Sequence, residues 1–353
     1  MSEYFSPDYI TAKMRFTERV DFQSATTYSL KLDAVDLQNR PLSIDIAWFG
    51  TQTPSTVILH SSGLHGVEGF AGSAIQLKLL QQLPVLPDSV ALVFVHLLNP
   101  YGMAWLRRTN ENNVDLNRNY LEKGQLYKGS PKAYATADPL INPVSPPSTD
   151  FFYAKAILSI LQHGYGTLKQ SIAGGQYDYP KGLFYGGDTL QQGLSLYKHW
   201  LTTNLSDVKN VLAIDVHTGL GKWGIDSLFI DSQMGVLDPD FYDKVQNNRV
   251  CRNYTESVAY QINGGLVALL LESFSKANID FILQEFGSYS PIKVLHALRE
   301  ENRCHFYSES HNLSHPAKQQ LKQIFYPQEP EWRSSVLERG VSLVHSAINH
   351  ISR

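Results

Sequence analysis

The chain has 353 residues, of which 43% are hydrophobic and 18% charged, so it can form one large domain with a buried core. Its net charge is −3 and it has no run of basic residues, which argues against a nucleic-acid or anionic-membrane partner. Residues 1–16 contain no apolar signal-peptide core, and no segment approaches about 20 uninterrupted apolar residues. Cys251 and Cys304 are too few for a disulfide framework. These features predict a cytoplasmic protein with reduced thiols.

Strands and helices are predicted to alternate along the chain, which is typical of an α/β sandwich. We expect strands at residues 42–48, 56–60, 90–96, 211–217, 227–230 and 281–285, and helices at residues 70–83, 151–161, 189–203, 239–247 and 292–302. Residues 124–150 are rich in Pro, Ser, Ala and Asn without periodicity, which indicates a rim or lid loop. The pattern then becomes helical at residues 316–324 and 330–351. We therefore expect a main domain of residues 1–307 and a C-terminal helical extension, residues 308–353, packed on it.

The segment SGLHGVEGFAG, residues 62–72, follows the predicted strand at residues 56–60. It places His65 and Glu68 three residues apart among four glycines. Glycine allows positive φ angles and close backbone approach, so the two side chains can converge on one ion. A histidine and a glutamate at this spacing are common by chance, so a metal site needs a third ligand from elsewhere in the fold.

The segment DVHTGLG, residues 215–221, supplies that third ligand, because His217 closes another apolar strand. Two histidines and one carboxylate leave the fourth position of a catalytic zinc ion open. Asp215 is a candidate hydrogen-bond acceptor for the ring of His217. His60 and His96 also end predicted strands, and we interpret them as buried core histidines.

Residues 99–119, NPYGMAWLRRTNENNVDLNRN, lie between these ligands. Together with HGVEGFAG, DVHTGLG and QEFGSYSP, this order of motifs resembles the M14-type zinc carboxypeptidase superfamily, which is carboxypeptidase A-like, and in particular its DUF2817 branch. The resemblance runs from about residue 55 to residue 302. It implies a three-layer α/β/α sandwich with a mixed central sheet.

The resemblance also implies roles for individual residues. His65, Glu68 and His217 would bind one zinc ion per chain. Asn117 and Arg118 would bind the terminal carboxylate of a substrate, a group that a guanidinium holds with two parallel hydrogen bonds. Arg107 would stabilise the oxyanion of the tetrahedral intermediate, with the neighbouring Arg108 as the alternative at this place.

Two glutamates compete for the role of general base. Glu285 ends the predicted strand FILQ and fits the late strand end where the family has its base, whereas Glu272 follows the apolar run LVALLL and is interpreted as a structural partner. Glu285 would take a proton from water and return it to the leaving nitrogen. Tyr289 and Tyr185 are equal candidates for a phenol beside the substrate carboxylate.

These assignments predict a zinc hydrolase of the metallocarboxypeptidase type that cleaves an amide next to a free carboxylate, with a small peptide as substrate. An N-acyl amino acid deacylase, similar to aspartoacylase and succinylglutamate desuccinylase, shares the same scaffold and would take acylated amino acids. A non-catalytic binding protein is a third reading. The motifs GxSxG and HExxH are absent, which disfavours a serine hydrolase and a thermolysin-like zinc site.

Overall fold

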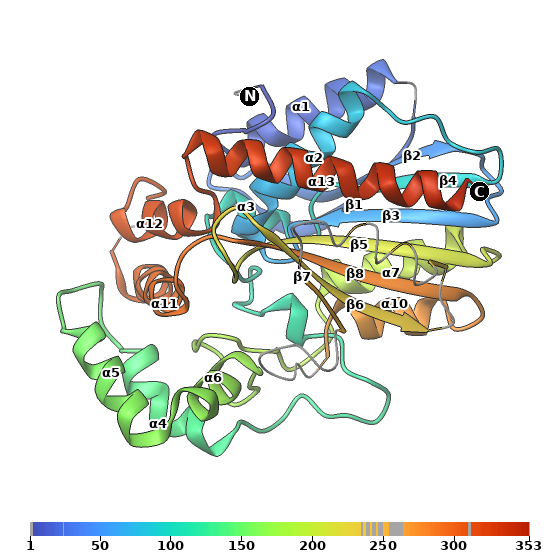
Figure 1. Cartoon of the computed structure of the whole chain (residues 1–353). Coiled ribbons are helices and arrows are strands. Elements are labelled where there is room, and N and C mark those ends of the chain that lie inside the picture. The colour runs from blue at the N-terminus through green and yellow to red at the C-terminus, as the bar shows by residue number, and fades with distance from the viewer. Residues whose placement is uncertain are drawn as a thin grey trace.

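A computed structural model describes residues 3–23, 25–233, 236–237, 241, 245, 250–253, 264–309 and 312–352. These residues form one eight-stranded sheet in the order β1-β2-β4-β3-β5-β8-β6-β7 (Figure 1). The strands are β1 (Thr26–Val35), β2 (Pro41–Gly50), β3 (Thr56–Ser62), β4 (Val90–Val95), β5 (Asn210–Gly219), β6 (Asp226–Gln233), β7 (Val250–Asn253) and β8 (Asn278–Gly287).

The sheet is mixed. Strand β3 runs parallel to both β4 and β5, and β5 runs parallel to β8, whereas β1–β2, β2–β4 and β6–β8 are antiparallel pairs. The parallel register places His217 of β5 directly opposite Glu285 of β8. Because β3, β5 and β8 run in the same direction, their carboxyl ends meet at one edge, where open α/β sheets place their ligand sites.

Helices cover both faces of the sheet (Figure 1). One face packs against α1 (Tyr9–Phe22), α2 (Gly69–Gln81), α3 (Pro100–Ala104) and α13 (Pro330–Ile351). The other face packs against α7 (Gln192–Asn204) and α10 (Leu266–Ser273). The predicted fold class, a three-layer α/β/α sandwich with a mixed sheet, is confirmed.

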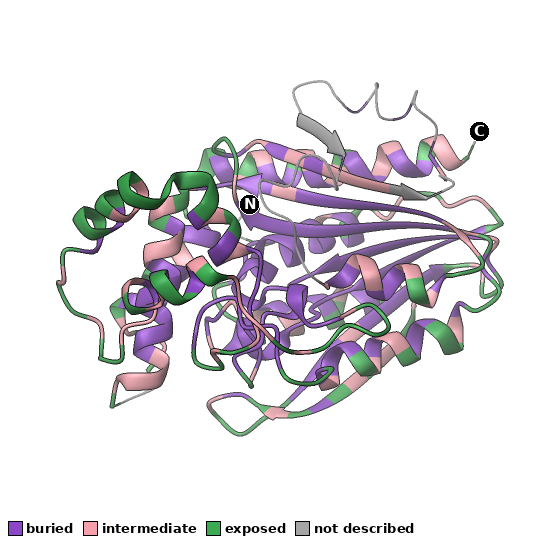
Figure 2. Ribbon diagram, turned by 90° about the horizontal axis from the view of Figure 1, so that it is seen from below, coloured by how far each residue is buried: buried purple, intermediate pink, exposed green. Residues whose placement is uncertain are grey.

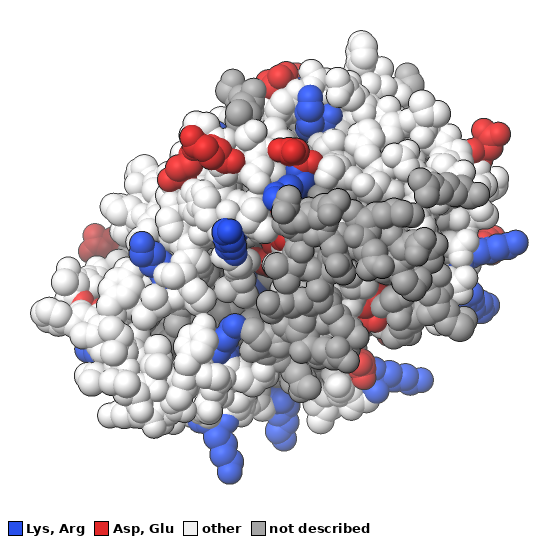
Figure 3. Space-filling view, viewed as in Figure 1, with Lys and Arg blue, Asp and Glu red and all other residues white. Residues whose placement is uncertain are grey.

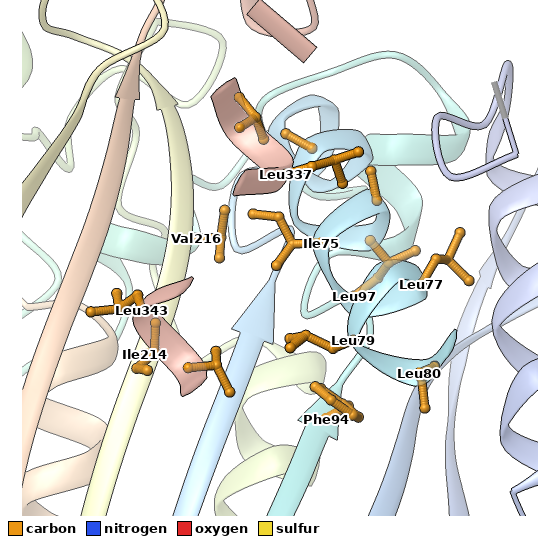
Figure 4. Packing of buried hydrophobic residues seen from close by; sticks show 14 of the residues in the cluster. Ile75, Leu77, Leu79, Leu80, Phe94, Leu97, Ile214, Val216, Leu337 and Leu343 are labelled. Atoms are coloured by element: carbon orange, nitrogen blue, oxygen red, sulfur yellow. The ribbon is translucent and has the colours of Figure 1, made fainter. Parts of the chain in front are cut away.

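The first of these interfaces is packed with buried hydrophobic side chains (Figure 4). Ile75 of α2 lies beside Val216 of β5, Leu343 of α13 lies beside Ile214, and all four side chains are buried. Complete burial of one such side chain stabilises the fold by about 1.5–3 kcal/mol. A Cβ atom at Gly340 would lie 2.4 Å from Cδ1 of Ile75. Glycine at this position therefore allows α13 to lie directly on α2.

A further group of helices lies beyond the carboxyl edge of β5 and β8, to the left of the sheet in Figure 1. It consists of α4 (Lys132–Ile141), α5 (Phe152–His163), α6 (Tyr165–Ala173), α11 (Pro291–Tyr307) and α12 (Pro316–Phe325). Their apolar residues share one cluster, in which Ile172, Leu298 and Phe325 are buried. Long exposed stretches remain on this helical group (Figure 2).

Six predicted strands and six of the seven predicted helices are present in the structure, the helix at residues 330–351 with the predicted ends and the others with shifted ends. The seventh, at residues 239–247, lies outside the described residues apart from two positions.

The interpretation of residues 124–150 as structureless is wrong, since α4 lies within them and packs Tyr134, Ala137 and Ile141 into the core. Strand β1 was not predicted, because its side chains alternate on a largely exposed edge strand and carry no apolar run.

The C-terminal segment shares its cores with earlier residues. Trp332 and Val344 of α13 belong to the cluster around α2, and Leu321 and Phe325 of α12 belong to the cluster around α11. The division at residue 308 stays a prediction. Among the described residues, no helix has the length and apolar character needed to cross a bilayer.

Two histidines lie in the core on the α2 face of the sheet, as interpreted from the sequence. The ring of His96 stacks on Phe16 at 4.2 Å and its Nε2 atom lies 2.9 Å from Ser73 Oγ. The ring of His60 packs edge-on against Phe94. Burial lowers the pKa of each histidine from 6.5 to about 4.

We expect these two histidines to make the fold sensitive to mild acid. Below pH 6.5 the unfolded chain protonates them while the folded chain does not until about pH 4, so the free energy of unfolding falls across this window. The loss is up to about 3 kcal/mol for each histidine at about 1.4 kcal/mol per pKa unit. Urea unfolding between pH 7 and pH 4 measures it. His96→Gln should fall less steeply than wild type, and exposed His199→Gln should follow wild type. Identical slopes for all three proteins would contradict the assignment.

Candidate active site

The backbone after β3 presents two side chains to the carboxyl edge of the sheet. The strand ends at Ser62, and a short 3₁₀ helix, η1 (Gly66–Glu68), leads directly into α2. A Cβ atom at Gly66 would lie 2.2 Å from the backbone of Gly102, so glycine is needed for this close approach. His65 precedes η1 and Glu68 ends it, and both are buried.

His217, near the end of β5, completes a compact group with these two residues. One potential ligand atom from each of His65, Glu68 and His217 lies within 4.8 Å of the others. The two histidine Nδ1 atoms are 3.2 Å apart, and they lie 2.9 Å and 3.0 Å from the two oxygens of Glu68. Tetrahedral zinc with bonds of about 2.0–2.2 Å separates its ligands by roughly 3.3 Å. The donor set therefore fits a zinc ion.

The opposite nitrogen of each ring contacts an aspartate, and that of His65 also lies 2.7 Å from Arg108 Nη2. His217 Nε2 lies 2.6 Å from Asp215 Oδ2, and His65 Nε2 lies 3.2 Å from Asp115 Oδ1. Ser61 Oγ donates to the second oxygen of Asp215 at 2.6 Å. Metal-binding histidines commonly have such carboxylate partners, which fix the ring orientation and leave the other nitrogen facing the ion. This arrangement leaves the two Nδ1 atoms directed at Glu68.

Charge compensation keeps these buried groups ionised. Burial alone would raise the pKa of Glu68, but the charges and hydrogen bonds of His65 and His217 hold it well below its usual value. Burial likewise opposes the protonated form of His217, but Asp215 raises the pKa of that ring well above 6.5. The Arg108 and Arg118 guanidinium groups lower the pKa of Asp115 despite its burial.

The structure separates the two adjacent arginines. Arg108 donates from Nη1 to Glu68 Oε1 and from Nε to Asp115 Oδ2, both at 3.0 Å, and it lines the main cavity. Arg107 points elsewhere: it is 1% exposed and donates to Glu301, which also accepts from the buried Lys318. Of the two arginines, only Arg108 lines the cavity that contains the ligand group, and which of them stabilises an oxyanion stays a prediction.

Asn117 and Arg118 lie together in the cavity wall. Arg118 is fully buried and donates to the carbonyl oxygens of Ala173, at 2.6 Å from Nη2, and Asn117, at 2.9 Å from Nη1. Asn117 Oδ1 accepts from the backbone N–H of Leu266 at 3.4 Å. The structure places both side chains beside the metal-ligand group, and carboxylate binding by them stays a prediction.

The two candidate glutamates have different surroundings. Glu285 lines the same cavity and accepts from the backbone N–H of Leu220 at 2.8 Å. Burial and the charge of Glu68 raise the pKa of Glu285 to about 7. Glu272 instead has a half-exposed side chain that accepts from Tyr120 and Lys198, at 2.6 Å and 2.7 Å. Glu285 is thus the glutamate that faces the site.

Neither candidate tyrosine lines the cavity found in the described part of the chain. Tyr185 is buried in the cluster on the α7 face, and its carbonyl accepts from Asp115 N–H. Tyr289 packs edge-on against Trp223 at 5.1 Å. A role for either of them beside the substrate carboxylate stays a prediction, and among the described residues Tyr165 of α6 is the tyrosine that lines the cavity.

Residues 5–339 match the family described as "Protein of unknown function (DUF2817)". The chain belongs to the DUF2817 family. No curated protein matches it. The DUF2817 chain is similar in structure to carboxypeptidase A from Helicoverpa armigera, with 13% identity, a TM-score of 0.50, and coverage of 100% of this chain and 76% of that one. It is also similar to thrombin activatable fibrinolysis inhibitor (TAFI), with 10% identity, a TM-score of 0.52, and coverage of 99% and 75%. At these identities the similarity establishes a carboxypeptidase A-like fold, as predicted.

Sequence reasoning missed two parts of the site in this DUF2817 chain. Asp115 contacts both His65 and Arg108, and its position as the aspartate of DLNRN was the available signal. The second part is the apolar wall that α4, α5 and α6 add to the cavity. These helices carry no polar motif, so the sequence offered no signal for their place in the site.

Proposed function

We propose that this protein is a zinc-dependent hydrolase that cleaves an amide bond next to a free carboxylate. One observation carries the proposal: His65, Glu68 and His217 form a buried, aspartate-supported ligand group that shares a cavity with Glu285. A bound zinc ion would polarise the scissile carbonyl and lower the pKa of water. The carboxypeptidase A-like fold supports the same chemistry.

Each nearby side chain has a role that follows from its contacts. Glu285 takes a proton from the attacking water and later delivers it to the leaving nitrogen. The N–H of Leu220 fixes one oxygen of Glu285 at 2.8 Å, which orients the carboxylate. Arg108 is anchored by Asp115 and brings positive charge to the place where the carbonyl oxygen becomes negative. Asn117 and Arg118 bind the substrate carboxylate from the adjoining wall.

The deacylase reading is favoured by a specific feature, the mainly apolar cavity beside the ligand group. An acylated amino acid has the same amide next to a free carboxylate as the last bond of a peptide. The two readings therefore share every residue role and differ in what lies on the acyl side of the scissile bond.

Metal content tests the proposal directly. After dialysis against a weak chelator, we expect about one zinc ion per chain in wild type and almost none in His65→Ala, because three protein ligands are needed to hold the ion. His163→Ala is the matched control, since His163 is exposed at the end of α5, and it should retain the metal. Elemental analysis measures both. A folded, zinc-supplied wild type that retains no metal would overturn the hydrolase proposal and favour a binding protein.

A further inference from the structure

The cavity next to the ligand group is large and has two different ends. Its volume is about 380 Å³, within the roughly 300–1,000 Å³ range of sites for drug-sized ligands. The polar end contains the ligand group, Arg108 and Glu285. The remaining wall is mostly apolar and is formed by residues of α4, α5, α6, α11 and α12, among them Ile141, Ala156, Ile160, Ile172 and Leu298.

This wall offers few partners for a peptide backbone. A peptide N–H or C=O group that leaves water for an apolar surface loses its hydrogen bonds without replacement, at substantial cost. A hydrocarbon chain has no hydrogen bonds to lose and gains free energy from every methylene that it buries. The volume and the lining together suit an extended hydrocarbon group better than a peptide segment or an acetyl group.

Helix α5 carries apolar side chains both on the side that faces the cavity and on the opposite side. Ala156, Ser159 and Ile160 follow helical spacing and face the cavity. The opposite side exposes large apolar side chains, with Leu158 58% and Leu161 76% exposed. A chain longer than the cavity would therefore meet further apolar surface on the same helix.

The acidic and basic residues in the segment that contains α5 and α6 are also of one sign. Residues 151–173 contain two lysines, Lys155 and Lys169, and no aspartate or glutamate. On the face shown in Figure 3, the region of α4–α6 at the lower left is mostly uncharged. An amphiphile with a carboxylate head and an apolar tail complements this combination of charge and surface.

We infer that the substrate is an N-acyl amino acid with a long hydrocarbon acyl chain, which lies against α4, α5, α6 and α11. The inference rests on the proposed amide hydrolysis at the polar end of the cavity. Ala156 and Ile160 are the residues that select chain length, because they project from α5 into the cavity.

Binding of N-acylglycines tests the inference without turnover. We expect isothermal titration of Glu285→Gln with acetyl-, octanoyl- and dodecanoylglycine, below their micellar concentrations, to show a Kd that falls about two- to fourfold per added methylene until the cavity is full. The heat-capacity change should become more negative with chain length. Equal affinity for the three ligands, or tighter binding of a tripeptide of matched length, would overturn the inference.

Two variants of α5 locate the acyl chain. Ala156→Phe fills the cavity and should weaken dodecanoylglycine binding at least tenfold while leaving acetylglycine binding unchanged. Ala154→Phe makes the same change at an exposed position on the same helix, and it should bind dodecanoylglycine and acetylglycine as tightly as the protein with alanine at position 154. Ile160→Asn, at a half-buried position, provides a second test and should also lose the chain-length dependence. If Ala156→Phe and Ile160→Asn both keep that dependence, the chain lies elsewhere and the inference fails.

Turnover of the same acylglycines by wild type separates the two proposals. Glycine release that increases with chain length supports both. Release that does not depend on chain length overturns the inference and leaves the hydrolase proposal intact. Chain-length-dependent binding with no release from any acylglycine or peptide overturns the hydrolase proposal, while the acyl site stands.

Discussion

Replacing Glu285 by glutamine is expected to lower kcat by about 10³-fold while the protein keeps its metal and its fold. Glutamine preserves the shape of the side chain and can still accept the N–H of Leu220, but it cannot take a proton from water. General-base catalysis by a positioned carboxylate typically contributes 10²–10⁴-fold. Steady-state kinetics with an N-acyl amino acid or peptide substrate, together with elemental analysis of the same preparation, measures both properties.

Glu272→Gln is the matched control for this change. Glu272 pairs with Lys198 and Tyr120 at the surface, so its replacement should leave kcat within about twofold of wild type and cost at most about 1 kcal/mol of stability.

The dependence of kcat/KM on pH is a second test of Glu285 as the base. Glu285 acts as a base only when ionised, and burial raises its pKa to about 7, so the acid limb of kcat/KM in wild type should lie at or below about pH 7. Loss of metal from Glu285→Gln, or unchanged turnover, would show that another group is the base.

Replacing the adjacent arginines by methionine is expected to change different properties, the stability in the case of Arg107 and the turnover in the case of Arg108. Arg107→Met should lower the free energy of unfolding by about 3–5 kcal/mol, because it removes one partner from a buried network in which Glu301 accepts from Arg107 at 3.0 Å and from Lys318 at 2.7 Å. Arg108→Met should lower kcat by about 10²–10³-fold, as loss of an oxyanion-stabilising donor does. Arg108→Met should also lose stability, because it removes the partner of the buried Glu68 and Asp115 carboxylates, so kcat is the property that separates the two variants.

Denaturant unfolding and steady-state kinetics on both variants test this separation. Each variant is the control for the other, because the substitution is the same and the positions are adjacent. A large kcat loss in a stably folded Arg107→Met, with Arg108→Met active, would restore the original assignment of Arg107 as the oxyanion-stabilising residue.

The sequence by itself determined six of the eight described strands and the grouping of the ligand candidates. His65, His217 and Glu285 each stand at or just after the carboxyl end of an apolar strand, and parallel strands bring such ends to one edge of a sheet. This spatial consequence follows from chain direction alone, so no knowledge of side-chain packing was needed. The family could be predicted because its motifs are short, contiguous segments whose residue types and order stand in the sequence itself.

Only the tertiary structure decided which neighbouring side chains face that edge. Arg107 and Arg108 follow a residue with a positive φ of 51°, Leu106, in a segment without regular structure, where no periodicity specifies side-chain direction. The packing partners decide instead: Glu301, about 200 residues further along the chain, accepts from Arg107 and also from Lys318, while Glu68 and Asp115 accept from Arg108. The position of the apolar wall of α4–α6 in the cavity could not be predicted either, because an apolar residue in a helix has the same sequence pattern whether it faces a core or a cavity.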